Sequence, residues 1–262
     1  MALVEVRNLT KVFALGESAW GGRAKGEVRA VDDVCLDINE GETLGLVGES
    51  GSGKSTLGRL ILKLVQPTSG TVKYDNRIDV LAASASEMRR LRRDMQIIFQ
   101  DPFGSLDPRM RVREILAEPA IIHGASNGTA PPLTPDELLR AVGMDASALN
   151  KFPHEFSGGQ RQRIGIARAL ALRPKFIVAD EPVSALDVSV GAQIINLLAQ
   201  LQRDFRLTYL FISHSMPVVR YLATRIAVMY RGKLVEVGES EQVMSRPAHE
   251  YTRSLLAATP EM

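Results

Sequence analysis

The sequence predicts a doubly wound α/β fold, in which helices cover both faces of a mostly parallel sheet. Residues 43–62 have the pattern of a strand, a glycine-rich turn and an apolar-periodic helix that starts near Lys54. Three later apolar runs, MQIIFQ, KFIVAD and LTYLFISH, are bounded by helical or loop segments, as buried parallel strands are. The composition, with 45% hydrophobic and 24% charged residues, is that of an ordinary globular protein.

Further segments are expected around this core, within one domain that covers residues 1–262. Residues 1–45 alternate in strand fashion twice, on either side of a glycine-rich loop at 16–26, which predicts an antiparallel β region. Strand patterns stop between residues 101 and 165, where helical pieces and a polar loop at 126–132 predict an inserted helical subdomain. Residues 225–262 return to strand (RIAVMYRGKLVEVG) and end in short helices.

Charge and cysteine usage exclude several classes of protein. The 32 basic and 30 acidic side chains give a net charge of +2, too small for a dedicated nucleic-acid binder, so no nucleic-acid partner is expected. Cys35 is the single cysteine; it can form no intrachain disulfide, and its apolar neighbours predict a small buried side chain in a reducing compartment. The basic runs at 89–93 and 109–113 are short and interleaved with apolar residues, which favours solvated helix faces over a nucleic-acid or lipid-headgroup site.

The N-terminus does not have the layout of a signal peptide. The first residues, MALVEVRNLTKVF, alternate apolar with polar residues rather than placing basic residues before an apolar run. No run approaches the ~20 apolar residues that span a bilayer. Any membrane association is therefore expected to come through a partner.

A complete phosphate-binding motif, GESGSGKS, occupies residues 48–55. It follows a predicted strand and opens a predicted helix, as this motif requires, so a chance glycine-rich turn is the weaker alternative. The glycines let backbone N–H groups face phosphate oxygens, Lys54 would neutralise β/γ-phosphate charge, and Ser55 would offer its hydroxyl to Mg²⁺. The nucleotide-binding candidates in this loop are Gly48, Glu49, Ser50, Gly51, Ser52, Gly53, Lys54, Ser55 and Thr56.

Two carboxylates, Asp180 and Glu181, end the apolar strand that starts at Phe176. If this strand neighbours the strand of the phosphate-binding loop, Asp180 lies near Mg²⁺ and Glu181 beside the γ-phosphate. Asp180 is then a metal-ligand candidate, and Glu181 a general base or a group that orients the attacking water. Taken alone, such a pair is usually a solvated strand end; the upstream loop gives it significance.

Ser157, Gly158, Gly159 and Gln160 precede a helical pattern in which Ile164, Ala167 and Leu170 share a face. One interpretation is simple helix capping by Ser157. The other is a second phosphate site, in which the N–H groups of this helix N-terminus meet the γ-phosphate held by another chain. We favour the second interpretation because the motif occurs in a protein with a phosphate-binding loop.

These motifs and their order resemble those of the ATP-binding cassette (ABC) family over nearly the whole chain. The resemblance implies a P-loop NTPase fold with a RecA-like core, and an ATPase that binds ATP and Mg²⁺. It also implies that Gln100 reaches Mg²⁺ and reports to a membrane partner, that Asp187 belongs to a loop crossing a dimer interface, and that His214 contacts the γ-phosphate and holds Glu181 in register. Lys54, Gln100, Glu181 and His214 are thus the catalytic candidates.

Phe13 matches the position of the aromatic residue that stacks on adenine in the ABC family. A phenylalanine in an edge strand more often belongs to the core, so both interpretations stay open.

Within the ABC family, two segments resemble the ATPases of peptide and nickel importers: QDPFGSLDPRM after Gln100, and HEYTRSLLAATP near the C-terminus. GKSTLGRLILKLVQPTSG resembles the second of their two ATPase subunits. Three positions depart from the family pattern, Ser215 for Asp, Phe156 for Leu and Asp107 for Asn, and none removes a catalytic group. With one cysteine, the chain cannot hold the iron–sulfur cluster that some relatives carry.

The resemblance implies a set of partners and a location. Two cassettes, identical or different, would close around two ATP molecules, each between one chain's phosphate-binding loop and the other chain's residues 157–159. Transmembrane permease subunits would hold the cassettes at the cytoplasmic face of the inner (plasma) membrane, and an extracytoplasmic binding protein would deliver the solute.

Two other functions are considered for a cassette of this kind. A DNA-repair, chromosome-organising or ribosome-associated cassette normally carries a long coiled coil or a second cassette, and this sequence has neither. A regulatory cassette that binds ATP without hydrolysis is disfavoured by the intact Glu181 and His214.

Overall fold

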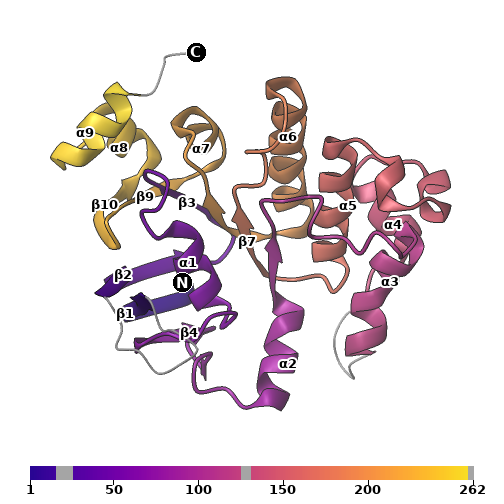
Figure 1. The fold of residues 1–262 in the computed structure, drawn as a ribbon, viewed down its shortest axis with the longest axis horizontal. Helices are drawn as coiled ribbons and strands as arrows, with labels where there is room; N and C mark the ends of the chain where they lie inside the picture. The colour runs from indigo at the N-terminus through magenta and orange to yellow at the C-terminus, as the bar shows by residue number, and fades with distance from the viewer. Residues whose placement is uncertain (16–25, 125–130, 259–262) are drawn as a thin grey trace. The chain divides into compact units, whose positions relative to one another are not determined.

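The computed structural model describes residues 1–15, 26–124 and 131–258. The backbone forms two compact units, one of residues 1–83 and 211–262 and the other of residues 84–210. The chain passes from the second unit back to the first within strand β8 (Thr208–Ile212), whose residues are all buried. The colours of Figure 1 follow the chain from β1 to α9.

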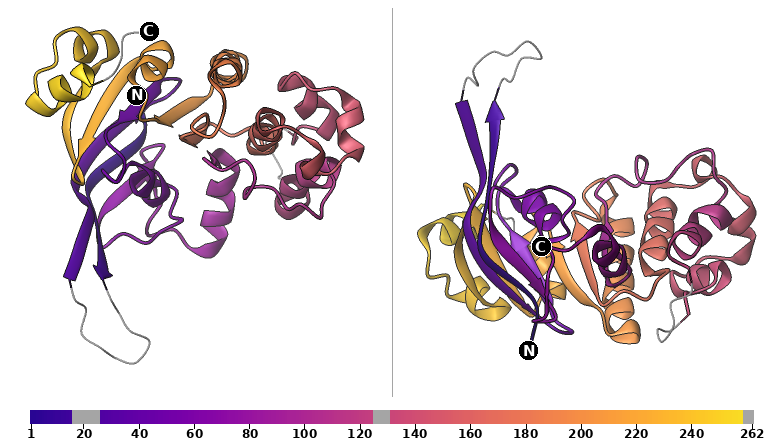
Figure 2. Two further views of the ribbon diagram at one scale, coloured as in Figure 1. Left: turned by 45° about the horizontal axis from the view of Figure 1, so that its top comes forward. Right: turned by 90° about the horizontal axis from the view of Figure 1, so that it is seen from below.

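The N-terminal part of the first unit is an antiparallel sheet. Strands β1 and β2 run side by side as a long two-stranded ribbon (Figure 2), and β4 and β5 continue the sheet on the other side of β1. The bounds are β1 (Ala2–Leu15), β2 (Gly26–Asn39), β4 (Ser69–Tyr74) and β5 (Ile78–Asp79). The antiparallel region predicted for residues 1–45 is confirmed; the predicted glycine-rich loop, apart from Gly26, lies outside the described residues.

Cys35 is exposed, so the prediction of a buried side chain is wrong. Successive side chains of a strand point to opposite faces, and the two neighbours of Cys35 in β2, Val34 and Leu36, are both buried. Cys35 therefore lies on the outer face, where its sulfur accepts a hydrogen bond from the backbone N–H of Asn8 over 3.3 Å.

The remainder of the first unit contains a parallel strand pair. Strand β3 (Thr43–Val47), buried throughout, pairs in parallel with β9 (Arg225–Tyr230), and β9 pairs antiparallel with β10 (Lys233–Glu239). Helix α7 packs so closely on β3 that a Cβ at Gly45 would lie 2.3 Å from Val219. The helices of this unit are α1 (Lys54–Ile61), α7 (Met216–Leu222), α8 (Ser240–Ser245) and α9 (Glu250–Ala257). Strands β9 and β10 and helices α8 and α9 lie in the C-terminal segment for which the sequence predicts strand and short helices.

The second unit combines a parallel strand pair with a helical segment. Strands β6 (Met95–Ile98) and β7 (Phe176–Asp180) pair in parallel. The described residues between 101 and 165 contain no strand, which confirms the predicted helical insert; the polar loop predicted at 126–132 lies largely outside the description. The helices are α2 (Ala85–Asp94), α3 (Val112–His123), α4 (Pro135–Ala141), the 3-10 helices η1 (Ala146–Asn150) and η2 (Pro153–Glu155), α5 (Gly158–Leu170) and α6 (Val188–Phe205).

The first basic run is only partly a solvated helix face. Arg89, Arg90 and Arg92 are exposed on α2, but Arg93 is buried and donates a hydrogen bond to the carbonyl oxygen of Gly124 over 2.9 Å. This guanidinium binds the C-terminal end of α3, where carbonyl groups lack intrahelical partners. The three arginines of the second run are exposed, as predicted.

In the described part of the chain, none of the helices has the length and hydropathy that crossing a membrane requires.

Candidate functional site

The phosphate-binding loop connects β3 to α1, as the sequence predicts. The strand ends at Val47 and the helix begins at Lys54. Gly48, Gly51 and Gly53 have positive φ angles of 148°, 79° and 108°, which side chains with a Cβ rarely adopt. This backbone turns the loop around the helix N-terminus, the usual place for an anion.

Two of these glycines are also required by close packing. A Cβ at Gly48 would lie 2.1 Å from the carbonyl oxygen of Met229 in β9, and one at Gly53 would lie 2.1 Å from the carbonyl oxygen of Ala30 in β2. The loop therefore lies directly against the backbones of two strands, and its shape depends on glycine at both positions.

Lys54 lies inside the curve of the loop. Its side chain is 4% exposed, and its ammonium donates hydrogen bonds to the carbonyl oxygens of Gly48 and Glu49, each over 2.8 Å. These carbonyls hold the ammonium at the place where a phosphate group would meet it. The predicted position of Lys54 at the start of α1 is confirmed.

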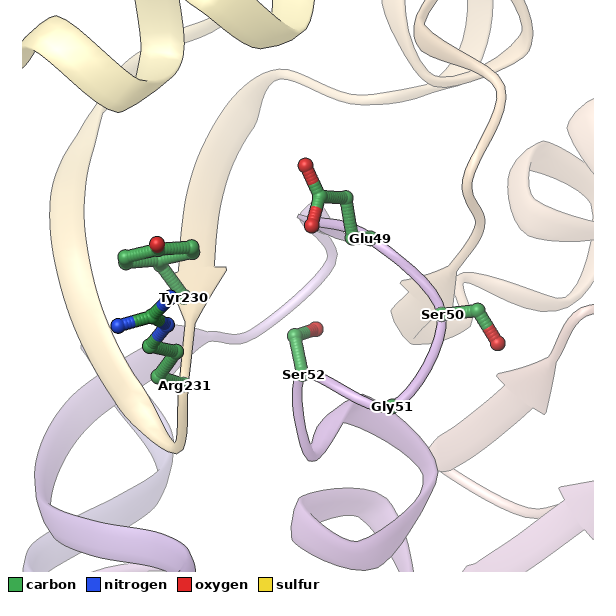
Figure 3. A pocket seen from close by; sticks show the side chains of 6 residues that line it. All are labelled: Glu49, Ser50, Gly51, Ser52, Tyr230 and Arg231. Atoms are coloured by element: carbon green, nitrogen blue, oxygen red, sulfur yellow. The ribbon is translucent and has the colours of Figure 1, made fainter.

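A pocket lies beside the loop and is lined by Glu49, Ser50, Gly51, Ser52, Tyr230 and Arg231. Figure 3 shows the loop residues on one side and Tyr230 and Arg231, at the turn between β9 and β10, on the other. The hydroxyl of Ser52 is buried and has no hydrogen-bond partner among the described residues.

Phe13 and His214 also belong to the first unit. The Phe13 ring is 40% exposed, with the ammonium of Lys11 4.8 Å from its centroid, so it is available for stacking rather than part of the core. His214 is exposed and directly follows Ser213, whose N–H donates to the carbonyl oxygen of Leu46. The neighbouring Ser215 N–H donates to the Ser213 hydroxyl over 3.0 Å. A backbone hydrogen bond thus fixes the turn that carries the imidazole even without an aspartate at 215.

Asp180 and Glu181 lie at the carboxyl end of β7 in the second unit. Asp180 is 1% exposed, whereas Glu181 is half-buried and has a positive φ of 48°. The Glu181 carbonyl accepts hydrogen bonds from both the N–H and the hydroxyl of Ser184, at 3.2 and 3.1 Å. These bonds close a turn directly after the strand.

Gln100 contacts Glu181: its side-chain amide donates a hydrogen bond to a carboxylate oxygen over 3.2 Å. The register of the parallel strands β6 and β7 explains the contact. Ile98 lies opposite Ala179, and both strands end at the same edge of the sheet. Sequence analysis assigned each residue a role but missed their direct contact. The signal was available, since polar residues follow the carboxyl ends of two short apolar runs.

Ser157 caps α5, as predicted. Its hydroxyl accepts the N–H of Gln160 at 3.4 Å, and the Gln160 side-chain oxygen accepts the Ser157 N–H at 3.0 Å, which completes a capping box. Gly159 is required by packing, because a Cβ there would lie 2.3 Å from Val190 in α6. Ser157 remains exposed at the helix N-terminus. Capping is thus confirmed, while the role as a second phosphate site stays a prediction.

Asp187 immediately precedes α6 and is exposed. Its side chain makes no capping hydrogen bond to that helix. The carboxylate is therefore not needed to start the helix, which is compatible with the predicted place in an interface loop.

Helix α5 also holds the segment that follows Gln100, a feature that sequence analysis missed. The Arg161 guanidinium lies 4.2 Å from the centroid of the exposed Phe103 ring, and the Arg168 guanidinium donates to the carbonyl oxygen of Ser105 over 2.6 Å. Burial lowers the pKa of Arg168. The two arginines lie on one face of the helix about two turns apart, a spacing that could have indicated a shared partner.

The model of the ABC transporter family matches residues 31–184. The chain belongs to this family, as its phosphate-binding loop and its Ser157 and Asp180 motifs predict.

Several relatives named for peptide transport are similar in sequence to this chain. The chain is 52% identical to the putative oligopeptide transport ATP-binding protein YkfD of Bacillus subtilis, over 99% of this chain and 77% of that protein. It is 51% identical to the dipeptide transport ATP-binding protein DppF of Lactococcus lactis, over 98% of this chain and 81% of that protein. The chain is also 52% identical to the oligopeptide transport ATP-binding protein OppD of Mycobacterium tuberculosis, over 99% of this chain and 42% of that protein. The predicted similarity to the peptide-importer group is confirmed; the second-subunit type stays a prediction.

A solved structure shows the same fold. The dimeric structure of a post-hydrolysis state of the ATP-binding cassette MJ0796, bound to ADP and Pi, matches 90% of this chain and 98% of its own with a TM-score of 0.76 at 32% identity. The predicted cassette fold is therefore confirmed.

Proposed function

We propose that the chain is the ATP-hydrolysing subunit of an ABC importer of peptides or similar small solutes. The observation that carries this proposal is the phosphate-binding loop, with three glycines at positive φ and the Lys54 ammonium inside the curve. Loops of this geometry present backbone N–H groups and one lysine to nucleotide phosphates.

In the proposed complex, the phosphates of ATP bind backbone N–H groups of the loop around the start of α1, and Lys54 exchanges its two carbonyl partners for phosphate oxygens. The exposed ring of Phe13 stacks on the adenine. Ser55, Gln100 and Asp180 offer a hydroxyl, an amide oxygen and a carboxylate, the hard oxygen donors that Mg²⁺ prefers. When bound, Mg²⁺ neutralises negative charge on the phosphate oxygens.

Glu181 acts as the general base or water-orienting group in this proposal. The hydrogen bond from Gln100 orients the Glu181 carboxylate, which accepts a proton from the attacking water. His214 is exposed at the end of its strand and donates to the γ-phosphate as the bond to the leaving group breaks.

A second cassette completes the site. The exposed N-terminus of α5, with Ser157 and Gly158, supplies N–H groups to the γ-phosphate bound by the other chain, and Asp187 lies in the contact between the chains. The dimeric structure of MJ0796 with ADP and Pi supports the pairing of two cassettes. ATP binding closes the dimer, and hydrolysis removes the γ-phosphate that joins the halves.

The transport function follows from the relatives. Proteins named for oligopeptide and dipeptide transport share about half of their residues with this chain across nearly its whole length. The proposed partners are therefore two permease subunits, a second cassette and, indirectly, an extracytoplasmic solute-binding protein. The chain would work at the cytoplasmic face of the membrane, attached through the permease.

Peptide uptake by whole cells tests the transport proposal. A strain that lacks the gene is complemented with the wild type or with Lys54→Met, and uptake of a labelled tripeptide is measured. We expect uptake only with the wild type, while both proteins are present at equal levels. Unchanged uptake in the deletion strain would exclude a role in importing that peptide class.

A further inference from the structure

The phosphate-binding loop is hydrogen-bonded to the C-terminal helix of its own unit. The backbone N–H of Glu49 donates to the hydroxyl oxygen of Tyr251 over 3.0 Å, although the two residues are 202 positions apart. Tyr251 lies in the first turn of α9, and Glu49 lies at the outer side of the loop, where it lines the pocket of Figure 3.

The position of Tyr251 depends on how α9 is attached to β10. The carboxylate of Glu236 accepts the N–H groups of Ala248 and His249, at 2.7 and 3.0 Å, directly before the helix. The Nδ1 atom of His249 in turn accepts the N–H of Tyr251 over 3.1 Å. These bonds fix the start of α9 and with it the base of the Tyr251 side chain.

The Tyr251 ring is fixed by stacking. Its centroid lies 4.1 Å from that of Tyr230, with an angle of 30° between the rings, and the Arg231 guanidinium lies 5.0 Å from the Tyr230 centroid. Burial raises the pKa of the Tyr251 phenol, against the effect of the Glu49 N–H, so the hydroxyl stays protonated at neutral pH. A neutral hydroxyl in one orientation is thus presented to the loop.

The peptide groups around Glu49 are bonded on both sides. The Glu49 N–H is bound by Tyr251, while its carbonyl oxygen accepts the Lys54 ammonium at 2.8 Å and the Ser52 N–H at 3.2 Å. When Lys54 turns to a phosphate, its bond to Glu49 is lost, but the bond from Glu49 to Tyr251 does not involve any group that phosphate must displace.

We propose that the Tyr251 hydroxyl is a positioning residue for nucleotide binding, which holds the outer side of the phosphate-binding loop in its binding conformation before ATP arrives. This inference rests on the proposed nucleotide site at residues 48–56. A loop that is ordered in advance loses less conformational freedom on binding, so affinity rises without a new contact to the ligand. Because Tyr251 acts through the loop, its hydroxyl affects ground-state and transition-state binding alike, which changes KM and leaves kcat unchanged.

The test removes the hydroxyl alone. Tyr251→Phe keeps the stacked ring and loses the acceptor of the Glu49 N–H. MgATP binding is measured by titration calorimetry, and hydrolysis by steady-state kinetics. We expect Kd and KM to rise about five-fold with kcat within two-fold of wild type, as for loss of one neutral hydrogen bond. Amide hydrogen exchange in the peptide that covers residues 44–57 should be faster than in wild type.

Two further variants separate this role from general effects. Tyr209→Phe removes a buried phenol hydroxyl that has no hydrogen-bond partner among the described residues, so we expect wild-type affinity. Glu236→Ala loosens the attachment of α9 and should raise KM in the same direction as Tyr251→Phe, which provides an independent route if that variant folds poorly.

The outcomes distinguish the inference from the site on which it rests. If Lys54→Ala binds MgATP as tightly as wild type, the assignment of the nucleotide site to this loop is wrong, and so is the proposed role of Tyr251. If Lys54→Ala loses binding but Tyr251→Phe keeps the wild-type Kd, only the positioning role is overturned. A lower kcat with unchanged KM in Tyr251→Phe would overturn it equally.

Discussion

The side-chain amide of Gln100 donates a hydrogen bond to the carboxylate of Glu181 over 3.2 Å. Gln100 follows β6 and Glu181 follows β7, so the pairing of these two parallel strands brings the two residues together. The glutamine therefore orients the Glu181 carboxylate, and a movement of the segment after β6 would change that orientation.

Gln100→Ala should lower kcat for ATP hydrolysis about ten-fold, because Glu181 loses the group that orients it. Gln100→Glu should lower it further, since a second negative charge would face the Glu181 carboxylate at hydrogen-bond distance. Both rates are measured with purified protein at saturating MgATP. Gln96→Ala, on the same strand but away from Glu181, is the matched control; equal losses in the control and in Gln100→Ala would contradict the assigned role.

Gly53→Ala should abolish nucleotide binding and lower Tm. Gly53 has a φ of 108°, and an added Cβ would lie 2.1 Å from the carbonyl oxygen of Ala30. Gly41→Ala is the matched control, because Gly41 also has a positive φ, 75°, but nothing lies within 4 Å of an added Cβ. It should cost only the backbone strain of about 1 kcal/mol. Calorimetric titration with MgATP and thermal unfolding measure the two effects. Normal binding by Gly53→Ala would show that the loop tolerates a different path.

Ser157→Asp should keep the helix cap and lose ATP-dependent dimerisation. Aspartate caps helices as well as serine does, so Tm should change little. Its charge would repel the γ-phosphate that the second cassette presents. Light scattering with MgATP measures the dimer, with Thr134→Asp as control because Thr134 caps α4 through the same kind of capping box. Dimerisation by Ser157→Asp as strong as that of the control would leave Ser157 as a cap and nothing more.

Glu236→Gln should destabilise the protein by about 1 kcal/mol at pH 7, since the half-buried carboxylate accepts two N–H groups before α9. Burial raises the Glu236 pKa, but hydrogen bonds from the N–H groups of Ala248 and His249 act against burial, and the pKa lies below its usual value. A depressed pKa stabilises the folded state above the pKa of the unfolded chain, and this contribution disappears as the pH falls through the folded value.

The pH dependence gives the matching measurement. The difference in free energy of unfolding between wild type and Glu236→Gln should have its largest value at pH 7 and should decrease below pH 4.5. Glu241→Gln, which removes an exposed carboxylate on α8, should show no such change. A difference that stays constant down to acid pH would show that ionised Glu236 is not what holds α9.

Local patterns predicted the parts of the site that depend on neighbours in sequence. The start of α1 at Lys54 and the cap at Ser157 were predictable because glycine conformations and capping boxes act within a few residues. Asp180 was placed correctly at a strand end for the same reason. The exposed position of Cys35 was missed although the alternation in β2 contains it: Val34 and Leu36 face the core, which leaves Cys35 on the other face.

Contacts between distant residues could not be predicted in this way. The bond between Gln100 and Glu181 depends on the register of β6 and β7, which no short motif specifies. The hydrogen bond between Glu49 and Tyr251 joins residues that are 202 positions apart. No sequence pattern indicates that a particular backbone N–H will meet a particular tyrosine hydroxyl. Such pairs arise from packing of the whole unit.

ATP hydrolysis by this cassette is proposed to depend on the Glu181 carboxylate. Single-turnover hydrolysis of MgATP by wild type and Glu181→Gln tests this most directly. Dimer formation is followed by light scattering in the same samples. We expect the wild type to release phosphate and Glu181→Gln to bind ATP with wild-type affinity, hydrolyse it at least a hundred-fold more slowly, and accumulate as an ATP-bound dimer. Hydrolysis by Glu181→Gln at the wild-type rate would contradict the account.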